Sequence, residues 1–262
     1  MQGKLLFLGT GSSAGIPMIG CKCAVCLSSS AKNKRFRPAA LLEVNGKKLL
    51  IDASPDFREQ ALKYDITNID GLLLTHAHYD HIGGLDELRI FYLLEKKHVP
   101  CLLSKETLEE LKRSYYYLFC SANTKRTLSA QFDFLPLEKD VGEVIFQDIK
   151  IGYLSYFQKE AKVTGYKIGD LAYVSDIKEY SEDIFTHLRG VNTLIVSALR
   201  ENDSPMHFNL QDALAFAKKV NAKKTYFTHI AHDIDHEKMQ KTLPQNIYFA
   251  YDGLEIEFFY ER

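Results

Sequence analysis

The sequence predicts an α/β (α+β) fold in which two β-sheets lie back to back between outer layers of helices, a four-layer αββα sandwich. One observation behind this prediction is that strand-like and helix-like runs alternate along the chain, with no low-complexity linker between them. Another is that both halves of the chain repeat one plan, a hairpin that ends on an aspartate and a later strand that ends on Thr-His, at Thr75-His76 and Thr228-His229. We expect these strand ends to meet along one shared edge and to carry the functional site.

The composition excludes several classes of protein. The chain has 262 residues, of which 46% are hydrophobic, so we expect one folded domain over residues 1–262 and exclude disorder. Its 33 basic and 34 acidic residues give a formal net charge of −1, which provides no overall attraction to nucleic acid or anionic lipid. Four consecutive apolar residues near the N-terminus are too few for a signal peptide, and no stretch approaches the ~18 apolar residues of a membrane span. We therefore expect a cytoplasmic protein without membrane contact or an extensive nucleic-acid surface.

The first half of the chain supplies strands for one sheet and helices to cover it. The predicted elements are a strand at Lys4–Leu8, strands at Leu41–Val44 and Lys48–Ile51, a helix at Pro55–Tyr64, a strand at Gly71–Leu74, and helices at Leu85–Leu94 and Ser104–Phe119. Asn45-Gly46 between two apolar runs is typical of a type I′ turn, so the second and third strands form a hairpin, which ends at Asp52. Ser104 is a typical N-cap for the last helix.

The second half repeats this plan. Its predicted elements are strands at Tyr166–Ile168, Leu171–Ser175 and Thr193–Ser197, a helix at Gln211–Val220, and strands at Lys224–Thr228, Ile247–Tyr251 and Leu254–Tyr260. Gly169-Asp170 and Asp252-Gly253 predict turns that join the first two and the last two of these strands into hairpins. The first of these hairpins ends on Asp176.

The strongest chemical motif follows the strand at 71–74, where residues 75–84 are Thr-His-Ala-His-Tyr-Asp-His-Ile-Gly-Gly. Imidazole and carboxylate ligands together suit zinc, manganese or iron. His76 and His78 can reach one ion while Asp80 and His81 turn toward a second, about 3.5–4 Å away, as two-metal hydrolases require. The alternative is a solvated loop that happens to be rich in histidine, which leaves the concentration of ligand types unexplained.

The cysteines give a second metal-type pattern. Cys21, Cys23 and Cys26 lie within six residues, and the total of five cysteines is odd, so a disulfide framework is not expected. Three thiolates need one more ligand to complete a closed tetrahedral zinc site, which would form a small structural insertion at about residues 20–30. The alternative is three reduced cysteines without a ligand. Cys101 and Cys120 lie in a strand-like and a helical run and are expected to be ordinary packed residues.

These motifs resemble those of a known family. The sequence His76-x-His78-x-Asp80-His81 is similar to the dinuclear motif of the metallo-β-lactamase-fold hydrolases, and the hairpin ending at Asp52 is similar to the strand that precedes that motif. A narrower resemblance is to the PhnP-type branch, which contains phosphoribosyl cyclic phosphate phosphodiesterases. It rests on the sequences at residues 9–13, 20–26, 52–58, 84–89 and 251–253.

The resemblance implies a set of metal ligands. It implies that His76 and His78 bind a first ion, that Asp80, His81 and His229 bind a second, and that Asp176 bridges both. It further implies that His232, three residues after His229, is the fourth ligand of a structural zinc ion with Cys21, Cys23 and Cys26. Asp176 and His229 each end an apolar strand, where a capping or satisfied polar role is the alternative for either one alone.

Substrate contacts are expected in the polar loop at residues 200–209. The resemblance implies that His207 acts as general acid or contacts the substrate phosphate, although a residue at the start of a helix is an equally simple interpretation. Arg200 is a candidate phosphate contact, with an ordinary surface arginine as the alternative. The aromatic run at residues 115–119 is expected to be core or a homodimer face, with stacking on a nucleobase as the alternative.

The function that follows is a metal-dependent phosphodiesterase acting on a small cyclic or nucleotide-like phosphodiester. Two divalent cations would lower the pKa of a bridging water so that hydroxide attacks phosphorus in line, with Asp80 orienting the nucleophile and His207 protonating the leaving oxygen. The alternatives are a tRNA 3′-end-type ribonuclease, a thioester or lactone hydrolase, and a non-catalytic metal-binding module with a degraded site.

One residue departs from the family pattern. Where the resembling family has a histidine on the first ion, seven residues before Gly165-Tyr166, this chain has Gln158. A neutral amide oxygen is a weaker ligand than imidazole for zinc. We therefore expect the first site to bind its ion loosely, or to favour a harder ion such as manganese.

Overall fold

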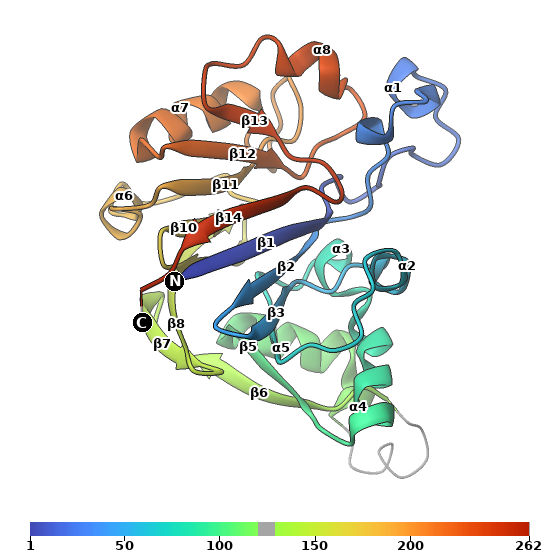
Figure 1. Ribbon diagram of the computed structural model, residues 1–262, viewed down its shortest axis with the longest axis vertical. Coiled ribbons are helices and arrows are strands. Elements are labelled where there is room, and N and C mark those ends of the chain that lie inside the picture. The colour runs from blue at the N-terminus through green and yellow to red at the C-terminus, as the bar shows by residue number, and fades with distance from the viewer. Residues whose placement is uncertain (120–128, 262) are drawn as a thin grey trace.

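The structure is a computed structural model that describes residues 1–119 and 129–261, and this part of the chain forms two seven-stranded sheets (Figure 1). The first sheet has the order β14-β1-β2-β3-β4-β5-β6 and the second the order β13-β12-β11-β10-β9-β8-β7. The strands of the first sheet are β1 (Gln2–Gly9), β2 (Ala39–Val44), β3 (Lys47–Ile51), β4 (Gly71–Leu73), β5 (Val99–Ser104), β6 (Phe132–Leu137) and β14 (Glu255–Phe259). Those of the second are β7 (Val141–Phe146), β8 (Ile149–Gln158), β9 (Ala161–Ile168), β10 (Leu171–Val174), β11 (Thr193–Ser197), β12 (Lys224–Thr228) and β13 (Ile247–Phe249).

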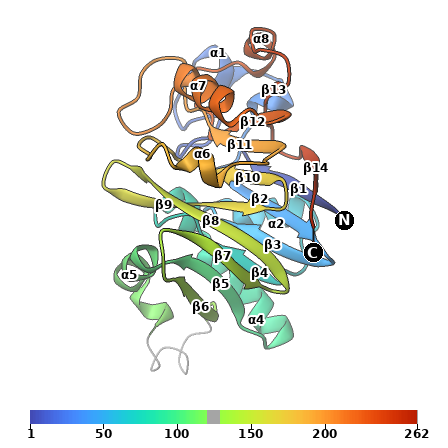
Figure 2. The same ribbon diagram turned by 90° about the vertical axis from the view of Figure 1, so that its left-hand side faces the viewer.

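Helices cover the outer faces of both sheets. They are α1 (Ala24–Leu27), α2 (Phe57–Lys63), α3 (Tyr79–Ile82), α4 (Arg89–Glu95), α5 (Lys105–Ser114), α6 (Ile184–His187), α7 (Leu210–Val220) and α8 (His236–Gln240), with 3₁₀ turns at Ala31–Asn33, Leu85–Leu88 and Tyr116–Leu118. Figures 1 and 2 show α7 and α8 toward one end of the molecule and α4 and α5 toward the other. No helix in the described ranges is long and apolar enough to cross a membrane.

Three apolar clusters separate the layers. The central cluster joins the facing sides of the two sheets, for example Phe7 of β1 with Ile151 of β8 and Tyr166 of β9. A second cluster lies between the second sheet and α6 to α8, and a third between the first sheet and α2 to α5. Burial of apolar surface on both faces of each sheet is what holds four layers together. The predicted αββα sandwich is therefore confirmed.

The local signals in the sequence act as expected at several element ends. Asn45 and Gly46 have φ angles of 53° and 73°, which the turn between β2 and β3 requires. The Ser104 side chain accepts a hydrogen bond from the Thr107 amide and caps α5. Asn209 caps α7 in a reciprocal capping box with Asp212. Other boundaries differ from the predicted ones. The helix α5 ends at Ser114, and residues 85–88, predicted as the start of a helix, form a 3₁₀ turn before α4.

The predicted C-terminal hairpin is wrong. β13 pairs in parallel with β12 in the second sheet, whereas β14 pairs antiparallel with β1 in the first. The chain crosses between the sheets at Asp252-Gly253, where the Asp252 carboxylate accepts hydrogen bonds from the amides of Thr10 at 2.9 Å and Phe36 at 2.6 Å. These long-range bonds replace the local pairing that the turn signal alone would favour.

Four further strands, β5, β6, β7 and β8, lie outside the predicted elements, although Cys101 of β5 was expected in a strand-like run. β6 and β7 are the outer strands of their sheets, and both have several exposed or half-exposed residues. Edge strands bury only part of each face, so their hydrophobic alternation is weak. Pairing within the sheets therefore determines where β6 and β7 form.

Candidate active site

The candidate site lies where strands from both sheets end. Asp52 follows β3, His76 follows β4, Asp176 follows β10 and His229 follows β12. Asp52, Asp176 and His229 have left-handed backbones, with φ angles of 59°, 56° and 56°. Residues other than glycine adopt this conformation at a cost in free energy, which is typical of functional sites. The shared edge predicted from the strand ends therefore brings these side chains together.

The ligands predicted for the second ion form one compact group. Nε2 of His229 lies 3.1 Å from Oδ2 of Asp80 and 3.1 Å from Oδ1 of Asp176. Nε2 of His81 lies 3.4 Å from Oδ2 of Asp80 and 3.1 Å from Oδ2 of Asp176. Ligands bonded to one zinc ion at 2.0–2.2 Å in tetrahedral geometry are about 3.3–3.6 Å apart. The spacing of these four side chains fits a shared divalent ion.

An orphaned atom tests this fit independently. His81 is fully buried, and its Nε2, although 3.1 Å from Oδ2 of Asp176, is not aligned for a hydrogen bond with any described residue. On the other side of the ring, Nδ1 lies 2.7 Å from Oδ2 of Asp52. An imidazole that donates Nδ1–H to a carboxylate has a lone pair on Nε2, which a metal ion can accept. The donor set therefore fits a metal better than it fits a hydrogen-bond network alone.

The histidines predicted for the first ion also come together. Nε2 of His76 lies 2.9 Å from Nδ1 of His78. His76 further forms a group with His81 and Asp176, whose ligand atoms lie within 4.8 Å of one another and could hold an ion. Asp176 thus belongs to the group of His76 and also contacts the predicted ligands of the second ion, with Oδ2 3.1 Å from Nε2 of His81 and Oδ1 3.1 Å from Nε2 of His229.

Asp52 is a site residue that the motif did not single out. It is fully buried and accepts hydrogen bonds from the Thr75 amide at 2.8 Å and the Thr75 hydroxyl at 2.8 Å, besides its contact with His81. It marks the end of the predicted hairpin in the sequence. An aspartate directly after an apolar strand was the available signal, but its partner could be recognised only in three dimensions.

The charges of the cleft are strongly coupled. Burial alone would lower the pKa of His81, but the surrounding carboxylates, Asp176 first, outweigh it and raise that pKa. Burial alone would raise the pKa values of Asp80 and Asp176, but His81 and His229 outweigh it and lower both. Burial lowers the pKa of His76, and His81 lowers it further. The cleft therefore combines ionised carboxylates with a neutral His76, which suits a cation.

His207 and Gln158 both reach the same cleft. Nδ1 of His207 lies 3.1 Å from Oδ1 of Asp176, and its ring stacks on His229 with centroids 4.9 Å apart. Nε2 of Gln158 lies 2.8 Å from Nε2 of His207. Asp176, His207 and His229 form a further group that is close enough to hold an ion. Arg200, at the start of the same segment, is exposed.

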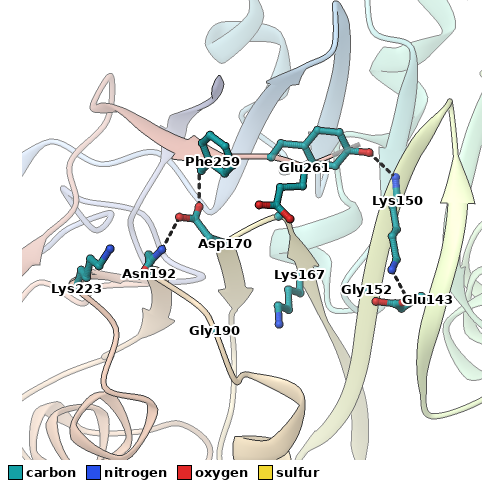
Figure 3. Close-up of a pocket in the computed structure, with 12 residues that line it drawn as sticks. Glu143, Lys150, Gly152, Lys167, Asp170, Gly190, Asn192, Lys223, Phe259 and Glu261 are labelled. Atoms are coloured by element: carbon teal, nitrogen blue, oxygen red, sulfur yellow. Dashed lines mark hydrogen bonds and ion pairs between the residues drawn. The ribbon is translucent and has the colours of Figure 1, made fainter. Parts of the chain in front are cut away.

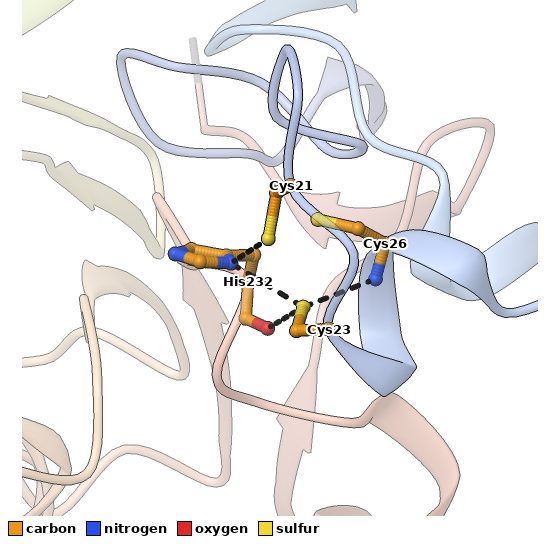
Figure 4. Close-up of side chains that lie close together, drawn as sticks. All are labelled: Cys21, Cys23, Cys26 and His232. Carbon is orange, nitrogen blue, oxygen red and sulfur yellow. Dashed lines mark hydrogen bonds between the residues drawn. The ribbon is translucent and has the colours of Figure 1, made fainter.

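The side chains of Cys21, Cys23, Cys26 and His232 lie close together (Figure 4). Nδ1 of His232 lies 3.3 Å from Sγ of Cys21 and 3.4 Å from Sγ of Cys23, and the four ligand atoms, with Cys26, lie within 4.8 Å of one another. A hydrogen bond from the Cys26 amide, together with His232, lowers the pKa of Cys23 to about 6. This donor set fits zinc. Cys101 is buried in the core, and Cys120 lies outside the described residues.

One segment joins the two candidate metal centres. His229, Ile230, Ala231 and His232 are consecutive, and the Ile230 backbone pairs with the loop after β1. The Ile230 amide donates to the Thr10 carbonyl, and the Ser12 amide donates to the Ile230 carbonyl, both at 2.9 Å. The loop after β1 therefore fixes the backbone between His229 and His232.

Other features lie away from the cleft. A cavity of about 620 Å³ lies beside the Gly169-Asp170 turn, at the end of β10 opposite to Asp176. Figure 3 shows the side chains that line it. Lys150 pairs there with Glu143 at 2.7 Å. In the aromatic run, Tyr115 and Phe119 pack partly buried against the core, as expected, whereas Tyr116 is exposed.

Comparison with known protein families identifies the superfamily of this chain. The chain matches the family model described as the beta-lactamase superfamily domain over residues 47–230. With its two mixed sheets, helical outer layers and His/Asp cluster, it belongs to the metallo-β-lactamase superfamily and is a hydrolase of that fold.

A narrower placement comes from individual proteins. The chain is similar to a solved diphosphatase from the PhnP family, with 36% sequence identity and a TM-score of 0.90 over 98% of both chains, which confirms the PhnP-type assignment. It is 31% identical over 257 residues to an octanoyltransferase of Porphyromonas gingivalis, covering 96% of this chain, and it spans about half (51%) of that protein. Human tRNase Z, short form, shares the fold, with 18% identity and a TM-score of 0.66 over 97% of this chain and 98% of the other.

Proposed function

We propose that this hydrolase is a metal-dependent phosphodiesterase whose substrate is a small cyclic or nucleotide-like phosphodiester. The observation that carries the proposal is the position of Asp176, which is close to His76 on one side and lies 3.1 Å from both His81 and His229, the residues that form a second ligand group with Asp80. Two-metal sites of this kind suit in-line displacement at phosphorus. Similarity to the PhnP-family diphosphatase supports chemistry at a phosphoryl group.

The candidate ligands would hold two ions of the zinc, manganese or iron class in the cleft and one structural zinc ion outside it. His76, His78 and Asp176 would hold the first ion of the cleft, and Asp80, His81, Asp176 and His229 the second. Cys21, Cys23, Cys26 and His232 would hold the structural zinc. Divalent ions in the cleft supply a water of lowered pKa and neutralise charge on the phosphoryl oxygens.

The side chains around the ions would position the reactants. The Asp80 carboxylate lies at the inner wall, 10% exposed, where it can accept a hydrogen bond from the attacking water and orient it. His207 is 14% exposed at the side of the cleft and can donate a ring N–H proton to the leaving oxygen. Burial lowers the pKa of His207, so its protonated form is a stronger acid than free imidazolium. Arg200 is an exposed candidate for the substrate phosphate.

A hydrolysis panel tests this proposal. Purified protein loaded with zinc, manganese or iron is assayed against a cyclic phosphodiester, bis(p-nitrophenyl) phosphate, a nucleoside diphosphate, a 3′-extended tRNA precursor and an acyl thioester. We expect turnover of the small diesters, and loss of that turnover in Asp80→Ala. Cleavage of only the RNA or only the thioester would overturn the proposal in favour of those activities. No turnover of any substrate by protein with both cleft metals bound would indicate a binding module.

A further inference from the structure

Gln158 brings an amide into a cleft whose other candidate ligands are histidine and aspartate. We propose that Gln158 binds the first metal ion through its amide oxygen, and that this oxygen shifts the first site away from zinc and toward a harder ion such as manganese. The inference rests on the proposed function in using the same metal-dependent cleft, but it is tested by metal binding and does not depend on which substrate is hydrolysed.

The first step of the argument is the burial of the amide. Gln158 is the last residue of β8 and is 2% exposed. Its Nε2 has partners, at 2.8 Å from Nε2 of His207 and 3.5 Å from Oδ1 of Asp176. Its Oε1 is buried without a hydrogen-bond partner among the described residues. A buried carbonyl oxygen without a partner is unfavourable, and its lone pairs are what a cation requires.

The second step is the ligand set of the first ion. Nε2 of His76 and Nδ1 of His78 are 2.9 Å apart. Within residues 1–119 and 129–261, however, no group of three or more closely spaced His, Cys, Asp or Glu ligands includes His78. The first ion therefore has fewer histidine and carboxylate ligands around it than the second. Gln158 reaches Asp176, the residue that both ions would share, with Nε2 at 3.5 Å from Oδ1; a half-turn of the terminal amide exchanges Nε2 and Oε1, so the oxygen can take that place and supply the additional ligand.

The third step is the chemistry of that ligand. His76, His78, Asp176 and Gln158 would give two imidazole nitrogens and two oxygens, one of them from a neutral amide. Carboxylate and carbonyl oxygens suit manganese and magnesium, whereas imidazole suits zinc, copper, iron and nickel. Replacing a third imidazole by an amide oxygen therefore weakens zinc binding more than manganese binding.

The experiment compares metal selectivity in three variants. Metal-free wild-type protein, Gln158→His and Gln158→Leu are dialysed against buffered mixtures of free Zn²⁺ and Mn²⁺, and the metals bound per chain are counted. We expect Gln158→His to shift the Mn:Zn ratio in the cleft at least tenfold toward zinc. We expect Gln158→Leu to bind the first ion at least tenfold more weakly. In the manganese-loaded wild type, the electron paramagnetic resonance spectrum should show a coupled ion pair, which Gln158→Leu loses.

A second buried glutamine provides the control. Gln60 is fully buried, and both ends of its amide have partners, since Ser54 donates to Oε1 and Nε2 donates to the Arg37 carbonyl. Gln60→Leu should leave the number and selectivity of bound metals as in the wild type. A change in Gln60→Leu equal to that in Gln158→Leu would overturn the assignment, because the effect would then follow from losing any buried amide.

Two outcomes in the main variants contradict the proposal. One is Gln158→Leu with wild-type metal number and affinity, and the other is Gln158→His with wild-type selectivity. If Gln158→Leu does not fold, anomalous scattering from manganese in wild-type crystals decides, since an ion bonded to Oε1 supports the proposal and an ion bonded without it overturns it. Metal selectivity as expected, with no phosphodiester hydrolysed, would refute the proposed function alone.

Discussion

Nδ1 of His81 lies 2.7 Å from Oδ2 of Asp52, and both side chains are fully buried. The carboxylate fixes the ring so that Nδ1 carries the proton and Nε2 faces Asp80 and Asp176. Asp52 is also held by two hydrogen bonds from Thr75, the residue before the metal-type motif. The residue that follows β3 therefore orients a side chain of α3, the short helix after β4.

We expect Asp52→Asn to weaken binding of the second ion by about 10- to 100-fold, because the amide cannot replace the carboxylate that orients His81. Competition with a chromophoric chelator measures this affinity. Asp65→Asn is the matched control, since Asp65 is exposed and has a similar left-handed backbone, with φ angles of 52° at Asp65 and 59° at Asp52. Equal affinity in both variants would show that Asp52 has no role in metal binding.

We expect Asp80→Ala and His81→Ala to lower hydrolytic turnover at least about a thousandfold, because loss of an ion removes several kcal/mol of transition-state stabilisation. The fold should persist, since both residues lie at the sheet edge and not among the apolar residues that join the sheets. Metal analysis should find one cleft ion fewer, with an unchanged circular dichroism spectrum. Full turnover with normal metal content would contradict the assignment.

We expect Cys23→Ser to lose one tightly bound zinc and to lower the unfolding temperature by about 5 °C or more, because binding energy in a closed zinc site contributes to folding. Zinc stoichiometry and thermal denaturation measure the two effects. Cys101→Ala is the control, since Cys101 is buried in the core away from the cluster. This control variant should change stability without changing zinc content. The same loss of zinc in both variants would show that the cysteine cluster does not hold the zinc ion.

We expect binding of the second ion to strengthen as the pH rises. The pKa values of His81 and His229 are raised in the metal-free cleft, so both hold protons that an incoming ion must displace. Affinity should therefore fall about tenfold per pH unit for each proton released as the pH drops below those raised values, and level off above them. The pKa of His76 is lowered, so the first ion displaces no proton from it.

Calorimetry in two buffers of different ionisation enthalpy counts these protons directly. The second ion should release at least one proton near neutral pH, and the His81→Ala variant should release fewer. An affinity for the second ion that is the same at pH 6 and pH 8 would show that the two histidines are already neutral in the metal-free protein.

A turn, a helix cap and the clustering of the candidate ligands follow from sequence signals that act over a few residues. Asn45-Gly46 sets its turn because both residues adopt positive φ readily. Ser104 caps α5 through an amide three residues away. The motif from His76 to His81 brings its ligands together because they lie within six residues, on the loop after β4 and the first turn of α3. Cys21, Cys23 and Cys26 likewise lie within six residues.

Interactions between distant segments decided the rest. β14 leaves the predicted hairpin to pair with β1, since hydrogen bonds from Thr10 and Phe36 hold Asp252 at the crossing between sheets. The place of Asp52 beside His81, and of Gln158 beside His207, follows from which strands are neighbours in a sheet and from how the two sheets pack. Ligand types and turns depend on local backbone and side-chain chemistry, and the sequence alone determined them. The partners of Asp52 and Gln158 depend on the burial that joins the two sheets, and only the tertiary structure decided them.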